Sequence, residues 1–319
     1  MTDMPGWVAP LAATAVLAAV AAGPQTALGA TRSAAAAHLG HSGTAVGAPG
    51  YAPVVATAGR CPGPGPLHPL TAYVLGYYSG TVTPIDAATG TALHRIRVGS
   101  MPEDIAATPD CKTVYAVNTN SGTVTPIRTA TDTALPPIKV VGNPVQIVIT
   151  PDGSTAYVTD SSGNRVTPIR TATNTALPPI KVGDGPSAIA VTPDGKTAYV
   201  ANSGSTTVTP IDTATNRALR PVKVGPNPSE VAVTPDGKTA YAVAGRGVTP
   251  IRTATNTALP PIKIGGGLVE IVITPDGKAA YVGGYLRNTV TPIDTATNTA
   301  LPPVKVGDGG AIAIVFATR

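Results

Sequence analysis

Aromatic residues are scarce in this chain of 319 residues: they make up 4% of it, with one tryptophan and one phenylalanine. Carbohydrate-binding sites usually stack sugars on aromatic rings, and Trp7 and Phe316 lie near the two termini. Charged residues are also few, at 12%, whereas a disordered chain carries more charge and less valine and isoleucine. The composition therefore predicts a folded protein without a sugar-stacking platform.

Runs of basic residues and catalytic arrangements of histidine are missing as well. The net charge is +5, but no Lys/Arg run forms the basic footprint that nucleic acid needs, so we exclude nucleic acid as a partner. Residues 71–319 contain one histidine, His94, which excludes a His-based acid–base pair or a Ser-His-Asp triad. These absences favour a protein that is not an enzyme.

The N-terminal residues suggest secretion. Residues 8–22 are apolar but too short for a membrane span, and small residues follow at 27–30. We predict a signal peptide over 1–30, no membrane span in the mature chain, and a secreted or cell-surface protein. Because the first residues lack Lys and Arg, a misassigned start codon or an uncleaved anchor is the alternative. Residues 31–70 are rich in Ala, Gly and Pro, and we interpret them as a flexible lead.

The rest of the chain is a tandem repeat. Six tyrosines recur at intervals of 42 residues, and of 40 at the last interval: Tyr73, Tyr115, Tyr157, Tyr199, Tyr241 and Tyr281. Within one repeat, "SAIAV", "TAYVA", "TVTPI" and "LRPVKV" are expected to form four strands, and "TPDGK" to form a turn between the first two. A period near 40 built from β segments indicates a β-propeller, with one four-stranded blade per repeat. A solenoid is the competing architecture.

The two ends of the repeat array complement each other. The array starts at Tyr73 with a second strand and ends with "GGAIAIVFATR", which matches a first strand. We therefore predict, over 71–319, an all-β, six-bladed β-propeller of four-stranded antiparallel blades, closed by pairing the C-terminal strand into the first blade. Residues 52–57, "APVVAT", also match a first strand and leave a seventh, irregular blade open. We expect a monomer.

The recurring phrases "VTPDGKTAYVANSGS" and "PIDTATNTA" resemble the YVTN family of β-propeller repeats, over roughly residues 72–319. The resemblance implies a propeller of extracellular or surface character. It does not imply one activity, because lactonases and a streptogramin-cleaving lyase have similar propellers.

One face of the predicted disc carries the variable loops. The loops between second and third strands differ in every blade, whereas the opposite face repeats "TPDG" and "TATNTA". Because binding needs asymmetry, we expect a site on the variable face, and unselected drift of exposed loops is the alternative. The hypothesis is a non-catalytic binding or interaction protein whose partner is an unknown protein or a cell-wall polymer.

Oxygen-bearing side chains are expected at the channel mouth on that face: Asp104, Gln146, Glu230 and Glu270. Such a ring would suit a divalent cation such as Ca²⁺, although no motif requires a cofactor. The alternative function is a metal-dependent hydrolase, or a lactonase-like or lyase-like propeller, that uses these carboxylates. Solvated rim charges paired with lysines are the simpler interpretation.

A second candidate cluster depends on ring closure, which would make the first and last blades neighbours. Their loops would then bring together Tyr77, Tyr78, Tyr285 and Arg287, an aromatic patch suited to binding a partner. Packing at the seam between the two blades is the alternative.

The two cysteines and the outermost strands complete the sequence expectations. Cys111 replaces the glycine of a "PDG" turn, and a Cys61–Cys111 disulfide would stabilise a secreted chain by roughly 3–4 kcal/mol.

Each fourth strand carries one basic residue, and most begin with Pro-Pro. These residues protect an exposed sheet edge, and binding of the basic residues to anionic cell-wall polymers is the alternative. Pro168 lies in an internal third strand, where it should remove a ladder bond unless that position is poorly paired.

Overall fold

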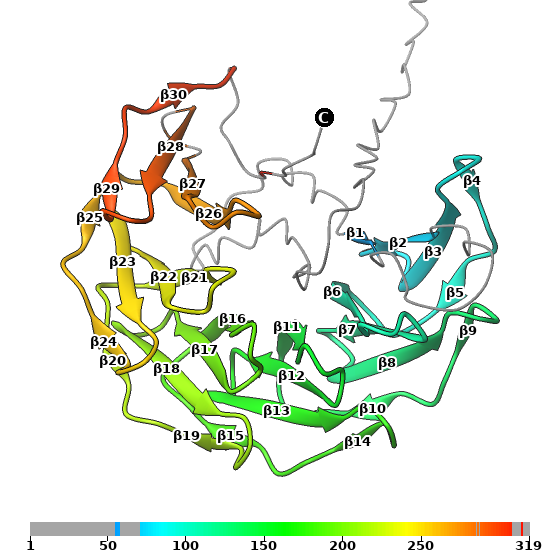
Figure 1. Cartoon of the computed structure of the whole chain (residues 1–319). Coiled ribbons are helices and arrows are strands. Elements are labelled where there is room, and N and C mark those ends of the chain that lie inside the picture. The colour runs from blue at the N-terminus through cyan, green and yellow to red at the C-terminus, as the bar shows by residue number, and fades with distance from the viewer. Residues whose placement is uncertain (1–54, 58–70, 285, 287, 308–313, 315–319) are drawn as a thin grey trace, which may run out of the picture.

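The computed structural model describes residues 55–57, 71–284, 286, 288–307 and 314. The predicted signal peptide and most of the lead lie outside the described residues. The described chain is all-β, with strands β1 to β30 arranged in six antiparallel sheets that follow one another around an arc (Figure 1). This confirms the predicted fold class: six repeated sheets, consistent with a six-bladed propeller. No described helix has the length and apolar character needed to cross a membrane.

Each sheet contains five consecutive strands, so that sheet 1 is β1–β5 and sheet 6 is β26–β30. The first strands lie nearest the centre of the arc (Figure 1): β1 (Val55–Thr57), β6 (Pro102–Ala107), β11 (Pro144–Ile149), β16 (Pro186–Val191), β21 (Pro228–Val233) and β26 (Leu268–Ile273). The second strands carry the repeat tyrosines: β2 (Thr71–Gly76), β7 (Thr113–Asn118), β12 (Thr155–Asp160), β17 (Thr197–Asn202), β22 (Thr239–Ala244) and β27 (Ala279–Gly284). The third strands are β3 (Thr81–Asp86), β8 (Thr123–Arg128), β13 (Arg165–Arg170), β18 (Thr207–Asp212), β23 (Gly247–Arg252) and β28 (Thr289–Asp294).

The outermost strand is broken into two pieces, where the sequence predicted one strand. Both pieces pair with the third strand of the sheet, one at each end of it. The pieces before the break are β4 (Thr91–Ala92), β9 (Thr133–Ala134), β14 (Thr175–Ala176), β19 (Arg217–Ala218), β24 (Thr257–Ala258) and β29 (Thr299–Ala300). The pieces after the break are β5 (Ile96–Arg97), β10 (Ile138–Lys139), β15 (Ile180–Lys181), β20 (Val222–Lys223), β25 (Ile262–Lys263) and β30 (Val304–Lys305). The break also occurs in sheet 1, where residues 93–95 contain no proline, so its common feature is the proline of the third strand, Pro84 in sheet 1 and Pro168 in sheet 3, which lacks the donor that a continuous ladder needs.

The break explains why Pro168 is tolerated inside an internal strand. The N–H and C=O groups of one strand residue point to the same side of the strand, and the Pro168 carbonyl accepts a bond from the Leu177 amide at 2.8 Å. Leu177 lies in the gap between β14 and β15, so the missing Pro168 donor faces the interrupted outer strand. Pro168 still lies opposite Tyr157 in the intact β12–β13 ladder. The proline therefore removes no bond between the second and third strands.

The hydrophobic core is divided among the seams between neighbouring sheets. At the seam between sheets 3 and 4, Tyr157, Val166 and Ile180 from sheet 3 pack against Ile189 and Ile211 from sheet 4. The other four seams between consecutive sheets repeat this arrangement with equivalent residues. Because each of sheets 2 to 5 contributes one face to each of two seams, nearly every apolar strand position in them is buried.

A hydrogen bond from the repeat tyrosine locks each of sheets 1 to 5 to the next sheet. The Tyr157 hydroxyl donates to the Asn216 side-chain oxygen at 2.6 Å, and Asn216 has a φ of 53° in the turn after the third strand of sheet 4. Asparagine tolerates this left-handed conformation, and the turn aims its side chain back at the tyrosine. The equivalent pairs are Tyr115–Asn174, Tyr199–Asn256 and Tyr241–Asn298, whereas Tyr73 donates to Asp132.

The predicted closure of the first blade by the C-terminal strand is wrong. The innermost position of sheet 1 is held by β1, in which Val55, Ala56 and Thr57 lie opposite Val74, Tyr73 and Ala72 of β2. The "APVVAT" segment therefore supplies the first strand that the array lacked, and the edge of β2 is no longer free for the C-terminal residues. Sheets 1 and 6 lie at the two ends of the arc (Figure 1).

The inter-sheet tyrosine bond can be tested with Tyr157→Phe. We expect a loss of about 1–2 kcal/mol in the free energy of unfolding, because the oxygen of the half-buried Asn216 loses its donor. Urea unfolding measures this loss. Tyr78→Phe is the matched control, since Tyr78 is 78% exposed. Equal stability of the two variants would show that the tyrosine hydroxyl does not hold the sheets together.

Candidate functional site

The candidate site lies on the face that carries the variable loops. Two kinds of loop meet there in each sheet: one joins the second and third strands, and the other joins the outermost piece to the first strand of the next sheet. We call this surface the variable face. The sheets differ on this face in the last residue of the second strand. From sheet 1 to sheet 6 these residues are Gly76, Asn118, Asp160, Asn202, Ala244 and Gly284.

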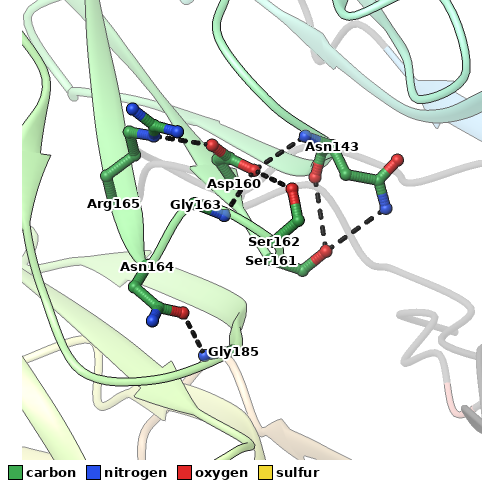
Figure 2. Close-up of polar contacts among 8 residues, drawn as sticks. All are labelled: Asn143, Asp160, Ser161, Ser162, Gly163, Asn164, Arg165 and Gly185. Atoms are coloured by element: carbon green, nitrogen blue, oxygen red, sulfur yellow. Dashed lines mark hydrogen bonds and ion pairs between the residues drawn. The ribbon is translucent and has the colours of Figure 1, made fainter.

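Asp160 holds the two loops of sheet 3 together (Figure 2). Its carboxylate is 2% exposed and accepts bonds from the Asn143 amide at 2.7 Å and the Gly163 amide at 3.1 Å. The second oxygen accepts a charged bond from Nε of Arg165 at 2.8 Å. Because Asn143 and Gly163 belong to different loops, one buried carboxylate fixes both of them.

Asparagine performs the same task in sheet 2 without a cation. The Asn118 oxygen accepts from the Gly99 amide at 2.9 Å, and its amide nitrogen donates to Thr123 at 3.1 Å. Asn202 donates in the same way to Thr207 in sheet 4. The residue that begins the third strand changes accordingly, with threonine beside each asparagine and Arg165 beside Asp160. In sheets 2 and 3 this side chain therefore bonds the loop from the preceding sheet, which suits a preformed surface, whereas in sheet 4 the Asn202 oxygen has no hydrogen-bond partner among the described residues.

Sheet 5 lacks this polar link and has a pocket instead. Ala244 replaces the asparagine, and an open pocket of about 540 Å³ lies between the two loops. Val224, Ile262 and Ile264 are among its apolar lining residues, and Arg246 and Lys263 supply two exposed cations. None of the residues that line the pocket is acidic. An anionic ligand with an apolar part would match this combination.

Two further departures from the repeat shape the pocket. The loop after Ala244 is two residues shorter than its equivalent in sheet 4, which withdraws its backbone from this region. Gly247 begins the third strand, where a Cβ atom would collide with the carbonyl oxygen of Ile262. The sequence predicted a site on this face but missed the pocket. The sequence signals were the interval of 40 residues between Tyr241 and Tyr281, and Ala244 and Gly247 at positions where the repeats of sheets 2 to 4 have larger residues.

The predicted ring of oxygen ligands has a structural role in the described residues. Asp104 accepts from the Ile147 amide at 2.9 Å, and Gln146 accepts from the Ile189 amide at 2.7 Å. Each bond therefore joins the first strand of one sheet to the first strand of the next. Glu230 and Glu270 occupy the equivalent positions of β21 and β26, and all four side chains are buried.

The Glu270 carboxylate repeats this bond with the C-terminal segment. It accepts from the Ile314 amide at 2.7 Å, and burial raises its pKa to about 8, with a smaller contribution from the nearby charge of Glu230. Within the described residues, no three Asp, Glu, His or Cys side chains gather closely enough to hold a metal ion. The structure therefore offers no cluster to which the calcium hypothesis can be assigned.

The aromatic patch is only partly described. The rings of Tyr77 and Tyr78 contact edge-to-face with centroids 5.0 Å apart, and Tyr78 projects into solvent. Tyr285 and Arg287 lie outside the described residues, and their loop belongs to sheet 6 at the other end of the arc (Figure 1). Two of the four predicted residues are therefore together, and a role for the patch stays a prediction.

Cys111 occupies a turn position that otherwise belongs to glycine. Its φ is 58°, in the left-handed region, whereas the equivalent residues are Gly153, Gly195, Gly237 and Gly277. A non-glycine residue is strained there, which suggests that the thiol has a specific use. Cys61 lies outside the described residues, so the disulfide stays a prediction.

The repeated sheets, with rigid loops and a pocket on one face, define the class as a β-propeller repeat protein. The chain is similar to a chain of hydrazine synthase from Kuenenia stuttgartiensis, with 26% identity and a TM-score of 0.63 over 75% of this chain and 84% of that one. It is also similar to a functionally unknown protein from Desulfotomaculum acetoxidans, with 18% identity and a TM-score of 0.61 over 76% and 84%. No family model matches the chain, and no curated protein matches it significantly. Because 1510 solved chains match, the fold does not select one activity.

The loop anchor of sheet 3 can be tested by exchanging it for the sheet 2 version. Asp160→Asn alone leaves the Arg165 guanidinium without its buried partner, and we expect a loss of about 2–4 kcal/mol in the free energy of unfolding. The double variant Asp160→Asn with Arg165→Thr recreates the Asn–Thr pair of sheets 2 and 4 and should recover at least half of that loss. Denaturant unfolding measures both. No recovery in the double variant would mean that the two anchors are not equivalent.

The raised pKa of Glu270 predicts how stability depends on pH. The folded-state pKa of about 8 exceeds the ordinary value of 4.5, so the unfolded chain releases this proton first as the pH rises. The free energy of unfolding should therefore fall by about 1–3 kcal/mol as the pH rises from 4.5 to about 8. Glu270→Gln should reduce that fall. Gln146 shows that an amide fits this position. Parallel pH profiles of the two proteins would contradict the assignment.

Proposed function

We propose that this protein is a non-catalytic binding module of the cell surface or secreted space, and that it takes its partner on the variable face. The observation that carries the proposal is where the sheets differ from one another in sequence. Strands, seams and the turns of the opposite face repeat closely, whereas the variable face differs from sheet to sheet and contains the pocket of sheet 5. A surface that is rigid and asymmetric is what selective binding requires.

The extracellular location rests on sequence. The apolar residues 8–22 fit a signal peptide, and the resemblance to YVTN repeats implies a surface protein. We propose that Cys61 and Cys111 form a disulfide in the oxidising environment outside the cell. The strained turn at Cys111 supports this pairing, because a glycine would serve the turn better unless the thiol were needed.

The partner that fits best is an anionic polymer of the cell wall. Arg246 and Lys263 lie at the pocket, and an exposed basic residue recurs on the outermost strand of every sheet. The pocket walls are apolar and carry no carboxylate, so a repeating phosphate or carboxylate on an organic backbone would find cations without repulsion. The alternative, a metal-dependent hydrolase or lyase, has no cluster of metal ligands among the described residues to support it.

Binding to cell-wall polymer can be measured by co-sedimentation with isolated wall sacculi that retain their anionic polymers. We expect the double variant Arg246→Gln with Lys263→Gln to bind at least about tenfold more weakly, because both pocket cations are lost. Ala244→Asn should weaken binding as well, since it adds the side chain that fills this position in sheets 2 and 4.

The control removes the same charge from the opposite face. Lys196 and Lys238 lie in the repeated turns and form exposed ion pairs with Asp194 and Asp236. Lys196→Gln with Lys238→Gln should bind as the wild type does. Equal weakening by both double variants would show that binding depends only on the net charge of the protein. Unchanged binding by all variants would refute the pocket of sheet 5 as the binding site. Retention on sacculi stripped of anionic polymer would show that the anionic polymer is not the partner.

A further inference from the structure

The floor of the pocket of sheet 5 is made of core side chains. Val224 and Ala244 belong to the hydrophobic seam between sheets 4 and 5, and Ile262 belongs to the seam between sheets 5 and 6. Each of the three is 6–7% exposed, and all three line the pocket. The pocket therefore crosses the end of sheet 5 from one seam to the other, over a hydrocarbon surface.

The fold does not use the two pocket cations. Arg246 and Lys263 are exposed, and neither side chain forms an ion pair or a hydrogen bond with any described residue. In sheet 3, by contrast, the buried carboxylate of Asp160 binds the Arg165 guanidinium (Figure 2). Both charges of the pocket are therefore available to a ligand.

Backbone bonds position the two cations beside the pocket. The Arg246 carbonyl accepts from the Ile264 amide at 3.2 Å and the Gly265 amide at 2.9 Å, which ties Arg246 to the loop that follows sheet 5. Lys263 lies opposite Gly247 in the β23–β25 ladder, whereas sheets 2 and 4 have threonine opposite the equivalent lysine. Because glycine has no side chain, the space beside Lys263 stays open.

The apolar floor and the cations set different requirements. A bare hydrated anion would satisfy the cations but leave the floor in contact with water, and an uncharged hydrocarbon would leave the cations without a partner. A neutral sugar fits less well, because no aromatic side chain lines the pocket to stack on its ring. Ligand pockets take affinity from apolar burial and orientation from a few charged groups. The lining therefore matches an anion attached to a hydrocarbon chain.

From this arrangement we infer that the pocket of sheet 5 selects an anionic group that carries a hydrocarbon chain. The phosphate or carboxylate pairs with Arg246 and Lys263. The chain covers the floor residues Val224, Ala244 and Ile262. The inference rests on the proposed function and narrows it, because it requires that the anionic wall polymer carries alkyl or acyl chains beside its charges.

Alkyl phosphates of increasing length test the inference. Ethyl, butyl, hexyl and octyl phosphate are titrated into the isotope-labelled full chain below their micelle concentrations, and the NMR shifts of the Gly247 and Gly265 amides give the dissociation constants. Affinity should rise by about fourfold for each methylene that the pocket buries fully, and should stop rising once the chain outgrows the pocket. Octyl glucoside, which has no charge, should bind more weakly than octyl phosphate.

Two variants separate the cations from the floor. Arg246→Gln with Lys263→Gln should bind octyl phosphate at least about tenfold more weakly but keep the gain per methylene. Ala244→Asn should lose most of that gain, because its polar side chain covers the floor, and the fold accepts asparagine at this position in sheets 2 and 4. Lys196→Gln with Lys238→Gln, on the opposite face, should bind as the wild type does.

The outcomes distinguish this inference from the proposed function. Equal affinity of the wild type for ethyl and octyl phosphate, or for octyl phosphate and octyl glucoside, would overturn the inference even where both cations are needed for binding to sacculi. Octyl phosphate should also displace the protein from sacculi. Chain-length dependence without displacement would overturn the wall polymer as the source of the chain, while the preference of the pocket for an amphiphilic anion would stand.

Discussion

The seam between neighbouring sheets is the constraint on which the rest of this structure depends. Each sheet must present one apolar face to the sheet before it and another to the sheet after it, and each seam is fixed by a tyrosine hydroxyl that meets a side chain in a left-handed turn. Burial and the nearby carboxylates of Asp212 and Asp152 raise the pKa of Tyr157 to about 12, so this donor stays protonated. Because all five described seams use the same pieces, the strands and turns that form them have little freedom to differ.

That constraint separates the two faces of the arc. The turns that receive the tyrosine lie opposite the variable face, which explains why "TATNTA" recurs with so few changes. The loops of the variable face take no part in the tyrosine lock, and one residue at the end of each second strand decides how they are held. A buried Asp or Asn bonds the loop from the preceding sheet in sheets 2 and 3, Asn202 of sheet 4 bonds Thr207 of the third strand, and Ala244 leaves room for a pocket. Selective binding can therefore change without disturbing the scaffold.

Much of the fold was predictable because it rests on periodic sequence. The tyrosine interval indicated the six sheets, and the odd position of Pro168 indicated a poorly paired place that proved to be the break in the outer strand. The closure of sheet 1 was predicted wrongly because "APVVAT" and the C-terminal segment both match a first strand, and sequence does not say which one pairs with β2. The candidate site was harder, because the buried oxygen of Asp104 and a solvated one look alike in a sequence. Only the neighbouring Ile147 amide, 43 residues away, reveals what that carboxylate does.

The seam also has a direction, and this gives the array two unlike ends. One side donates through tyrosine and the other accepts through Asn or Asp, so the last sheet offers a donor face and the first offers an acceptor face. The acceptor position changes along the chain from Gly90 to Asp132 and then to asparagine in the remaining sheets. Asp132 still accepts, and together with burial it raises the pKa of Tyr73 above its usual range. Gly90 accepts nothing through a side chain, so sheet 1 departs from the repeat at the point where it would have to receive a preceding sheet of the standard kind.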